Sequence, residues 1–411
     1  MTIVTPQSRA SVMSLPLAGV SVLDLSRALA GPYCTALLAD LGATIIKVES
    51  VNGGDITRAW PPFEGDHSLY FESINRGKSS IALDFYKPDA QKLLRDMALA
   101  SDVVVENFRS GVMTEMGLDP DELRREKPQL VIASISGFGE VGPLASSAGL
   151  DQVAQAMSGL MSITGPNASE FYRFGIPIID IVSGIFSAVG IIAALYQRDA
   201  VTSAGGEGAI VSTSLLESAI ALSVFQGQRY LSLGSAPTPT GNDHPSLTPY
   251  GVYHASDGPL VIAVGNDKQW MQFCALLGAP ALGTDERFAT GRARTDNRPA
   301  LKAELERLLA ARTAVAWTDI IREAGIPVGP IYTYDQVFDD EQVKALNMVV
   351  ETTRADGSNL PLVRGPISIN HEPTPITKNP PALGEDTDAV LASYGLSPEQ
   401  IADLRAQGVV R

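Results

Sequence analysis

The stretch Val20–Ser50, VSVLDLSRALAGPYCTALLADLGATIIKVES, decides the fold. Its two ends, VSVLDL and ATIIKVES, are short apolar runs of the kind found in buried strands, and the segment between them has the length and composition of a helix. Gly31 and Pro32 open this predicted helix, where proline costs no hydrogen bond, and Gly42 ends it. Strands that are apolar on both faces, joined by a helix, predict a parallel βαβ unit.

The same alternation continues along the chain. Further strands are predicted at Ser80–Phe85, Asp102–Phe108 and Leu130–Gly139, further helices at Pro88–Ala100 and Asp119–Glu126, and a strand running into a helix at Gly208–Gln226. Alternating strands and helices predict an α/β fold with a doubly wound, Rossmann-like large domain, in which ligands bind at the carboxyl ends of the strands. The sequence has no G-x-G-x-x-G after the first strand and no P-loop, so a standard nucleotide site is unsupported.

The composition changes after about residue 225. Leu233–Pro249 is rich in Gly, Pro, Ser and Thr, which is typical of a long loop at a domain boundary. A predicted hairpin turning at Asp257–Gly258 and several helices follow, and together they indicate a small α+β domain. We therefore expect residues 1–225 to form the first part of the large domain, 226–330 the small domain, and 331–411 the part that returns to the large domain. Ser397 is expected to cap a final helix.

Composition restricts the class of protein. The net charge is −15, with 31 Lys and Arg, which argues against binding to nucleic acid or to an anionic membrane. Cys34 and Cys274 are far apart and match no zinc or disulfide pattern, so two buried thiols in a cytoplasmic protein are expected. The first fifteen residues do not resemble a signal peptide.

The most apolar run is Ile176–Tyr196, IPIIDIVSGIFSAVGIIAALY, and Asp180 is its single charged residue. The run is long enough to span a membrane. Its early Pro177 and its many small residues instead favour a central helix that is packed on all sides. A carboxylate in an apolar setting is costly unless hydrogen bonds offset the cost. From this run alone, Asp180 is either a helix cap or a chemically active group.

Several motifs occur in a familiar order: the opening stretch, ENFRSG, GLDQVAQAMSG, IIDIVSGIFSAVGIIAALYQR and GNDHPSLTPYGVY. From about Leu15 to beyond Pro366 the chain resembles the family III coenzyme A transferases, a family that also includes the 2-methylacyl-CoA racemases. The resemblance implies acyl-CoA and carboxylic acid substrates, no permanently bound cofactor or metal, and an obligate homodimer of two interlocked chains.

The resemblance also implies a mechanism. Asp180 matches the aspartate that attacks the acyl-CoA thioester, forms a mixed anhydride and then carries CoA as an aspartyl thioester. The N–H groups at the start of its helix are expected to stabilise the carboxylate. Asp151 matches a second active-site acid, although a helix N-cap is the alternative. Leu150 stands where the racemases have a histidine, which favours a transferase. A racemase and a non-catalytic CoA-binding protein remain the alternatives.

Contacts to CoA are implied at the strand ends: Leu29, Ala30, Leu83, Asp84, Tyr86, Asn107, Phe108, Arg109 and Leu150. Ser50 and Glu115 stand where relatives often have basic residues for the phosphates. Lys47, Lys78 and Lys87 are nearby lysines that could replace them.

A loop that closes over the site is implied at Gly241 and Asn242, and in this loop His244 is expected to make a structural hydrogen bond. Arg173 could receive the distal carboxylate of a dicarboxylic acid such as succinate, mesaconate, citramalate or glutarate. An exposed position or a structural ion pair is the alternative for Arg173.

Overall fold

The computed structural model describes residues 15–200 and 206–411. Gly159–Arg173 and Gln228–Leu346 form a second compact unit, and the rest of the described chain forms the first. The second unit starts close to the expected boundary, but it continues past 330 and takes in an earlier segment. The Gly241 N–H donates to the Gly165 C=O at 3.1 Å, which ties that earlier segment to the later one.

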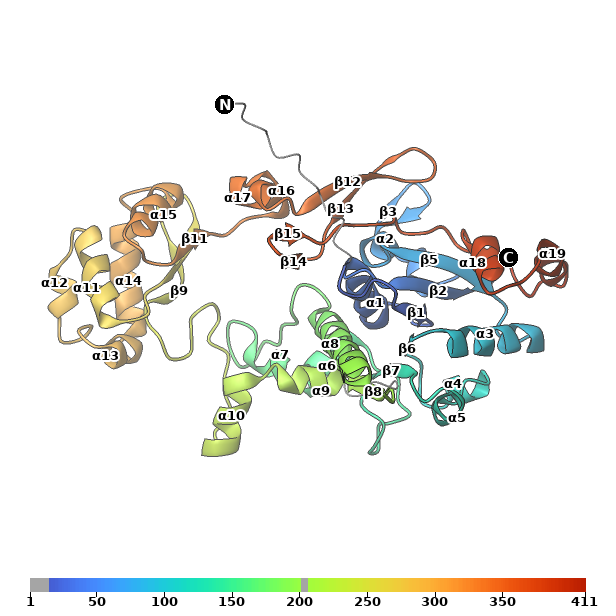
Figure 1. Cartoon of the computed structure of the whole chain (residues 1–411). Helices are drawn as coiled ribbons and strands as arrows, with labels where there is room; N and C mark the ends of the chain where they lie inside the picture. The colour runs from blue at the N-terminus through green and yellow to red at the C-terminus, as the bar shows by residue number, and fades with distance from the viewer. Residues whose placement is uncertain (1–14, 201–205) are drawn as a thin grey trace, which may run out of the picture. The chain divides into compact units, whose positions relative to one another are not determined.

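The first unit is built on a six-stranded sheet in the order β5-β2-β1-β6-β7-β8, and all of its strands are parallel (Figure 1). The strands are β1 (Ser21–Asp24), β2 (Thr44–Ser50), β5 (Lys78–Leu83), β6 (Val103–Glu106), β7 (Val131–Ser136) and β8 (Ile210–Ser214). Each lies where the sequence predicts a strand. Winding reverses between β1 and β6, and at such a reversal a crevice opens at the carboxyl ends of the strands.

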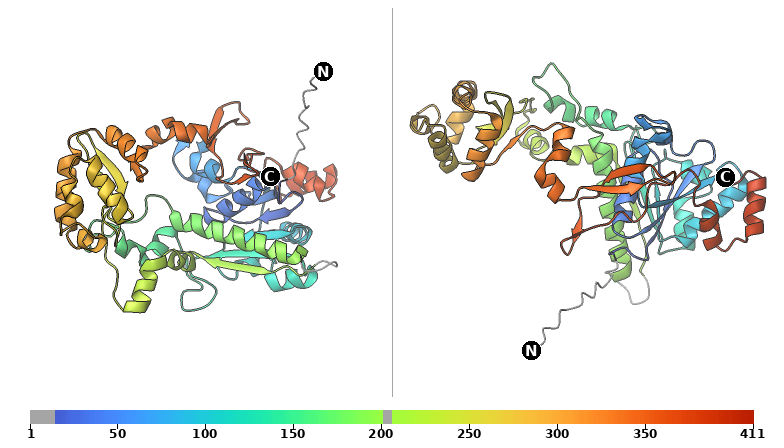
Figure 2. Two further views of the ribbon diagram at one scale, coloured as in Figure 1. Left: turned by 60° about the vertical axis from the view of Figure 1, so that its left-hand side comes forward. Right: turned by 90° about the horizontal axis from the view of Figure 1, so that it is seen from above.

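Helices cover both faces of this sheet. On one face, α1 (Ala30–Asp40) packs against α8 (Ile178–Ala200), and α8 also contacts β7 and β8 (Figure 2). The core on the other face joins alternate strand residues, such as Leu23 and Val104, to later helices. These helices are α3 (Pro88–Ala100), α4 (Val112–Glu115), α5 (Pro120–Glu126), α18 (Thr387–Ser393) and α19 (Pro398–Ala406).

The helix α8 differs from its expected packing. Its length and composition alone would allow it to cross a membrane, and the core helix of a soluble protein passes the same test. One face is buried: a Cβ on Gly184 would lie 2.6 Å from the Ala30 C=O of α1. The opposite face is exposed, with Phe186, Val189 and Tyr196 all accessible. The prediction that this helix is packed on all sides is therefore wrong for the single chain.

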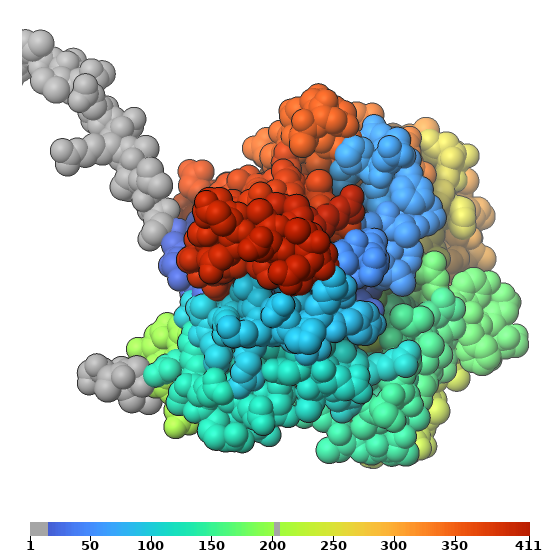
Figure 3. All heavy atoms as spheres, turned by 90° about the vertical axis from the view of Figure 1, so that its right-hand side faces the viewer, coloured from blue at the N-terminus to red at the C-terminus, as the bar shows by residue number. Residues whose placement is uncertain are grey.

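The C-terminal segment returns to the first unit through a hairpin of β12 (Val349–Thr353) and β13 (Asn359–Val363). The Asp386 carboxylate accepts the Ser80 N–H at 2.9 Å, and Val410 forms an antiparallel bridge with Leu83. Figure 3 shows the last helices, in red, against the blue N-terminal part of the unit. As predicted, Ser397 caps α19 and forms a capping box with Gln400.

Shorter elements complete the first unit: η1 (Ile56–Ala59), β3 (Phe63–Glu64), β4 (His67–Ser68), α2 (Leu69–Ile74), α6 (Asp151–Met157), α9 (Leu215–Ala221), β14 (Ser368–Ile369) and β15 (Glu372–Pro373). The helix α10 (Val224–Leu233) runs from the first unit into the second.

The second unit contains a three-stranded antiparallel sheet, β11-β10-β9, and a core formed by residues such as Trp270, Phe273 and Trp317. Its β9–β10 hairpin turns at the predicted Asp257–Gly258. Its elements are α7 (Leu160–Ile163), β9 (Tyr250–His254), β10 (Pro259–Ala263), α11 (Asp267–Leu276), α12 (Ala281–Thr284), α13 (Gly291–Asp296), α14 (Arg298–Leu309), α15 (Ala314–Glu323), β11 (Val328–Pro330), α16 (Tyr334–Asp339) and α17 (Glu341–Ala345).

Candidate active site

A pocket of about 430 Å³ lies within the first unit at the carboxyl ends of β1, β6 and β7. The loops after these strands, the turn before α6 and the first turn of α8 line it. Seven of the residues implicated by the sequence contribute to the lining: Leu29, Ala30, Asn107, Phe108, Arg109, Leu150 and Asp180. Their convergence from four distant segments makes this pocket the candidate active site.

Asp180 is the acidic group of the pocket. It is the third residue of α8, so it is not the N-cap, and its side chain is partly buried. Burial, followed by the nearby charge of Asp151, raises its pKa to about 7. A poorly solvated carboxylate with such a pKa is typical of a catalytic group.

Asp151 holds the first turn of α8. Its Oδ2 accepts the N–H groups of Ile179 at 2.7 Å and Asp180 at 3.2 Å, while its Oδ1 accepts from the Gln155 side chain at 2.5 Å. Asp151 is the first residue of α6, whose N-cap is Leu150. It therefore caps α8 rather than its own helix. Because Asp151 accepts these two N–H groups, they do not stabilise the Asp180 carboxylate. The expectation that the N–H groups at the start of α8 stabilise this carboxylate is therefore wrong.

The turn after β1 is held by side chains from other segments. Asn107 accepts the Arg27 N–H at 2.9 Å and donates to the Arg27 C=O at 2.7 Å. The Asp55 carboxylate accepts the Ala28 N–H at 3.1 Å, and the Lys47 ammonium donates to the Ser26 C=O at 2.9 Å. Ala28 has a φ of 66°, a left-handed conformation that costs on the order of 1 kcal/mol in a non-glycine residue. These four bonds therefore fix an otherwise unfavourable turn.

Two buried ion pairs lie beneath this turn. Lys47 pairs with Asp55 at 2.9 Å, and Lys78 pairs with Asp24 at 3.0 Å, with all four side chains almost fully buried. Burial lowers the pKa of Lys78 to about 8 despite the nearby Asp24. These two lysines are committed to structural pairs, and the Lys87 ammonium donates to a C-terminal backbone carbonyl. The idea that the three lysines replace missing phosphate contacts is therefore not supported.

Three residues expected to contact CoA lie outside the pocket lining. Leu83 is fully buried at the end of β5, and the Asp84 N–H donates to the Val409 C=O at 2.9 Å. The Tyr86 side chain is 90% exposed. The C-terminal segment thus forms hydrogen bonds with the backbone at this strand end.

The residues of the expected loop belong to the second unit. Gly241 has a φ of 60°, and Asn242 follows it in a turn. His244 stacks on Tyr250, and its Nδ1 accepts backbone N–H groups, which is the structural role expected for it. Arg173 also lies in the second unit and does not line the pocket.

Sequence reasoning missed the aromatic wall of the pocket. Trp60 follows η1 and Tyr70 lies in α2, and their rings meet edge to face with centroids 5.1 Å apart. Burial and the charge of Asp180 raise the pKa of Tyr70 to about 12. Both residues lie in the long segment between β2 and β5. The length of this segment could have pointed to them. Arg27, at the end of β1, was missed as well.

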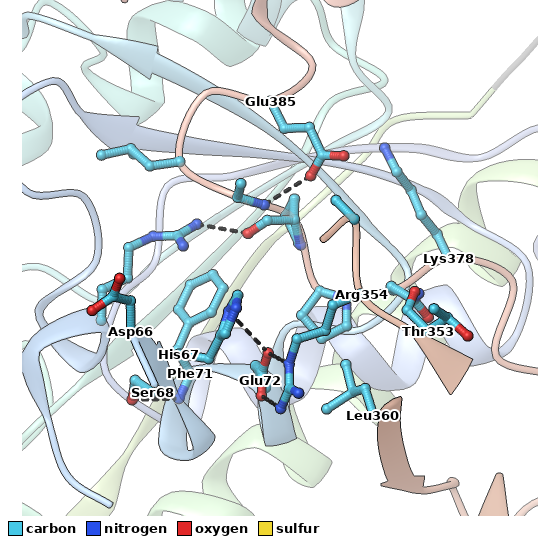
Figure 4. Close-up of a pocket in the computed structure, with 17 residues that line it drawn as sticks. Asp66, His67, Ser68, Phe71, Glu72, Thr353, Arg354, Leu360, Lys378 and Glu385 are labelled. Carbon is cyan, nitrogen blue, oxygen red and sulfur yellow. Dashed lines mark hydrogen bonds and ion pairs between the residues drawn. The ribbon is translucent and has the colours of Figure 1, made fainter. Parts of the chain in front are cut away.

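A second pocket, of about 540 Å³, lies between the β3–β4 region and the returning C-terminal segment (Figure 4). Figure 4 shows Arg354 against Glu72, and their two bonds measure 2.7 and 2.8 Å. Arg58 pairs with Glu49 and Lys378 with Asp386 in the same way. The cations that line this pocket are already paired with carboxylates. These ion pairs join two segments of the chain, so this pocket is a poorer candidate for the active site.

Comparisons with known proteins identify the family of the chain. The model of the family "CoA-transferase family III" matches residues 17–387. The chain is 39% identical to a succinate–glutarate CoA-transferase of Agrobacterium fabrum over 92% of this chain and 95% of that protein. It is 40% identical to an acetyl-CoA:oxalate CoA-transferase of Acetobacter aceti over 82% and 86%. The crystal structure of a CAIB/BAIF family protein from Brucella suis superposes with a TM-score of 0.82, at 38% identity, over 92% of this chain and 99% of that one.

Proposed function

Because this chain belongs to the family III CoA-transferases and is an enzyme, we propose that it moves CoA from an acyl-CoA thioester to a free carboxylic acid through Asp180. The observation that carries this proposal is the position of Asp180. It is a partly buried carboxylate, with a pKa of about 7, in a pocket at the strand ends.

The proposed reaction has four covalent steps, which run in two mirrored pairs. An Asp180 oxygen attacks the thioester carbon, the C–S bond breaks, and the CoA thiolate leaves a mixed anhydride. The thiolate then attacks the Asp180 carbonyl carbon, which frees the donor acid and leaves an aspartyl-CoA thioester. The acceptor carboxylate attacks the aspartyl carbonyl carbon of this thioester, the C–S bond breaks, and the CoA thiolate leaves a second anhydride. The thiolate finally attacks the acceptor carbonyl carbon, the anhydride C–O bond breaks, and the Asp180 carboxylate is restored. No proton or external oxidant is needed.

The surrounding residues support this chemistry by position. Asp151 fixes the first turn of α8, and the close approach of Gly184 to α1 sets the distance between Asp180 and the turn at Leu29. Burial weakens the solvation of the carboxylate and so makes it more nucleophilic. Shielding the pocket from water also protects an anhydride from hydrolysis.

We propose a dicarboxylic acid as the acceptor, such as succinate, mesaconate, citramalate or glutarate. The Agrobacterium relative is named for succinate and glutarate, and the Acetobacter relative for oxalate. A racemase is the less favoured alternative, because it needs two acid/base groups around the α-carbon. The side chain of Leu150, which lines the pocket, cannot act as an acid or a base. The Tyr70 phenol, with a pKa of about 12, is a poor base near neutral pH.

We also propose that the enzyme is an interlocked homodimer that acts in the cytoplasm, without membrane insertion or nucleic acid. The exposed apolar face of α8, with Phe186, Val189 and Tyr196, supports burial against a second copy of the chain. The buried free thiols of Cys34 and Cys274 suit a reducing compartment.

The test is exchange of an isotopically labelled free acid into the acyl-CoA pool. The wild-type enzyme should incorporate label, and Asp180→Ala should reduce the rate more than about 1,000-fold while CoA still binds. Deuterium uptake at the α-carbon without acid exchange would support the racemase instead. An Asp180→Ala enzyme that retains exchange would overturn the proposed nucleophile.

A further inference from the structure

Two arginines, Arg27 and Arg109, line the pocket that contains Asp180, and both side chains are exposed. Within the described part of the chain, neither has a carboxylate partner, and Asp180 is the only acidic residue of the lining. Neither guanidinium contributes to the pKa of Asp180, whose causes are burial and Asp151. The pocket therefore holds positive charge that its own nucleophile does not neutralise.

The two arginines differ in what else they contact. Arg109 also lines an adjoining pocket of about 310 Å³, which extends past Gly111 toward Asp121. Arg27 lines the pocket of Asp180 and not the adjoining one. A long ligand that leaves the reaction site, such as CoA, would pass Arg109. A short ligand that stays beside Asp180 has Arg27 as its available cation.

Arg27 is held so that only its guanidinium is available to a ligand. Asn107 binds both its backbone N–H and its C=O, and Asp55 and Lys47 fix the residues on either side. Its guanidinium carbon lies 5.7 Å from the centre of the Phe108 ring, a cation–π distance that restricts the side chain. Such preorganisation lowers the entropy lost when the guanidinium binds an anion.

We propose that Arg27 binds the second carboxylate of a dicarboxylic acid substrate and so selects dicarboxylates over monocarboxylates. Guanidinium binds carboxylate through two parallel hydrogen bonds, which suits a charge carried at the far end of a short acid. This inference rests on the proposed transferase function. It assigns to Arg27 the role that the sequence suggested for Arg173.

The experiment compares wild type, Arg27→Ala, Arg27→Lys and Arg109→Ala in acid exchange, with each substrate varied in turn. The donor is an acyl-CoA whose acyl group has no second carboxylate, such as acetyl-CoA, so that only the acceptor can use the proposed site. Glutarate and butyrate serve as acceptors of similar length that differ by one carboxylate. Arg27→Ala should raise the KM for glutarate about 10- to 100-fold, as expected when a charge-assisted hydrogen bond is lost. The KM for acyl-CoA should change less than about twofold, and any preference for glutarate over butyrate should fall by the same factor. Arg27→Lys should lie between Arg27→Ala and wild type.

Three outcomes would overturn the proposal. A rise in the KM for acyl-CoA with the glutarate KM unchanged would assign Arg27 to the CoA phosphates. Equal loss with both acids, together with a lower melting temperature, would assign it a structural role. A change in acid preference in Arg109→Ala but not in Arg27→Ala would exchange the two assignments. Absence of exchange in wild type with every acid would instead reject the proposed function.

Discussion

The reactivity of Asp180 depends on two neighbouring features, its burial and the negative charge of Asp151. Both favour the neutral acid, so the pKa rises to about 7. In the proposed mechanism the nucleophile is the ionised form of Asp180. Its fraction therefore increases with pH through the physiological range, and the catalytic rate should follow it.

The first prediction concerns this pH dependence. In wild type, kcat/KM for acyl-CoA should rise with pH and level off above a midpoint near 7, because kcat/KM reports the free enzyme. Asp151→Asn keeps an oxygen that can cap α8 but removes a negative charge, so it should lower the pKa of Asp180. The rising limb should then move to lower pH by a measurable fraction of a unit or more. An unchanged midpoint in the variant would show that the Asp151 charge does not act on Asp180.

The second prediction concerns stability at the same residue. The pKa of Asp180 is higher in the folded protein than its ordinary value of 3.8. The resulting stability is complete below pH 3.8 and is lost as the pH rises through about 7. The side chain of Asp180→Asn cannot ionise, so at pH 8 the variant should have a higher melting temperature than wild type. Its free energy of unfolding should be larger by about 1 kcal/mol or more, given about 1.4 kcal/mol per pKa unit.

Thermal unfolding of both proteins at pH 5 and pH 8 measures this effect. The advantage of the variant should shrink at pH 5, where Asp180 is largely protonated in wild type. Equal differences at the two pH values would mean that ionisation of Asp180 does not cost stability.

At the scale of elements, the start of α1 and the start of α8 form one assembly. Gly184 lies one helical turn after Asp180, and its missing side chain lets α8 approach the Ala30 C=O. Helix packing therefore controls the position of Asp180 relative to the turn at Leu29 and Ala30. Any side chain at 184 has to separate the two helices.

The third prediction follows from that contact. Gly184→Ala places a Cβ 2.6 Å from the Ala30 C=O, so it should destabilise the protein by about 1–3 kcal/mol through overpacking. It should also lower kcat at least tenfold, because Asp180 moves with the helix. Gly190→Ala is the matched control, since its Cβ would meet Val211 of β8 at 2.5 Å, away from the pocket. It should cost stability while the folded enzyme keeps its kcat, and equal kcat values for the two variants would contradict the argument.

Elements defined by local pattern were predictable from the sequence. The helix α3 has the predicted bounds, and Ser397 forms the predicted cap, because periodicity and capping are local signals. The segment from η1 to α2 was not predicted. Its short pieces depend on tertiary contacts, such as the Ser68 hydroxyl donating to the Thr57 and Trp60 carbonyls at 2.7 Å.

The candidate site divides in the same way. The isolated charge drew attention to Asp180 but left a helix cap as the alternative, and the resemblance to the family supplied its expected role and the strand-end residues. The role of Asp151 could not, because its carboxylate caps a helix 28 residues away. The difference between Arg27 and Arg109 could not be predicted either, because the pockets that each arginine lines form only in the folded chain.

At the scale of the whole molecule, the first strands that the structure describes and the C-terminal segment share one core. Ile401, Val409 and Val410 are buried in the same cluster as residues of β1, β2 and β5. The described N-terminal strands therefore depend on the last residues for part of their apolar contacts.

The fourth prediction tests this dependence. Deleting residues 397–411 removes these three apolar side chains from the core, each worth about 1.5–3 kcal/mol when fully buried. The truncated protein should melt at a clearly lower temperature or remain insoluble. It should lose acid-exchange activity to the extent that it unfolds. Deleting Arg411 alone is the control and should behave as wild type. A truncated protein with an unchanged melting temperature would refute the dependence.

The bridge between Leu83 and Val410 has a consequence for synthesis on the ribosome. The strand β5 is at the edge of the sheet, and its partners on that side, Asp386 and Val410, come much later in the sequence. During translation the edge of β5 stays open until Asp386 and Val410 emerge, while the sequence of the second unit is complete once Leu346 is made. An unfinished chain thus exposes an edge strand that invites aggregation. Emergence of Asp386 to Val410, rather than emergence of the β5 sequence, marks the point at which this edge becomes protected.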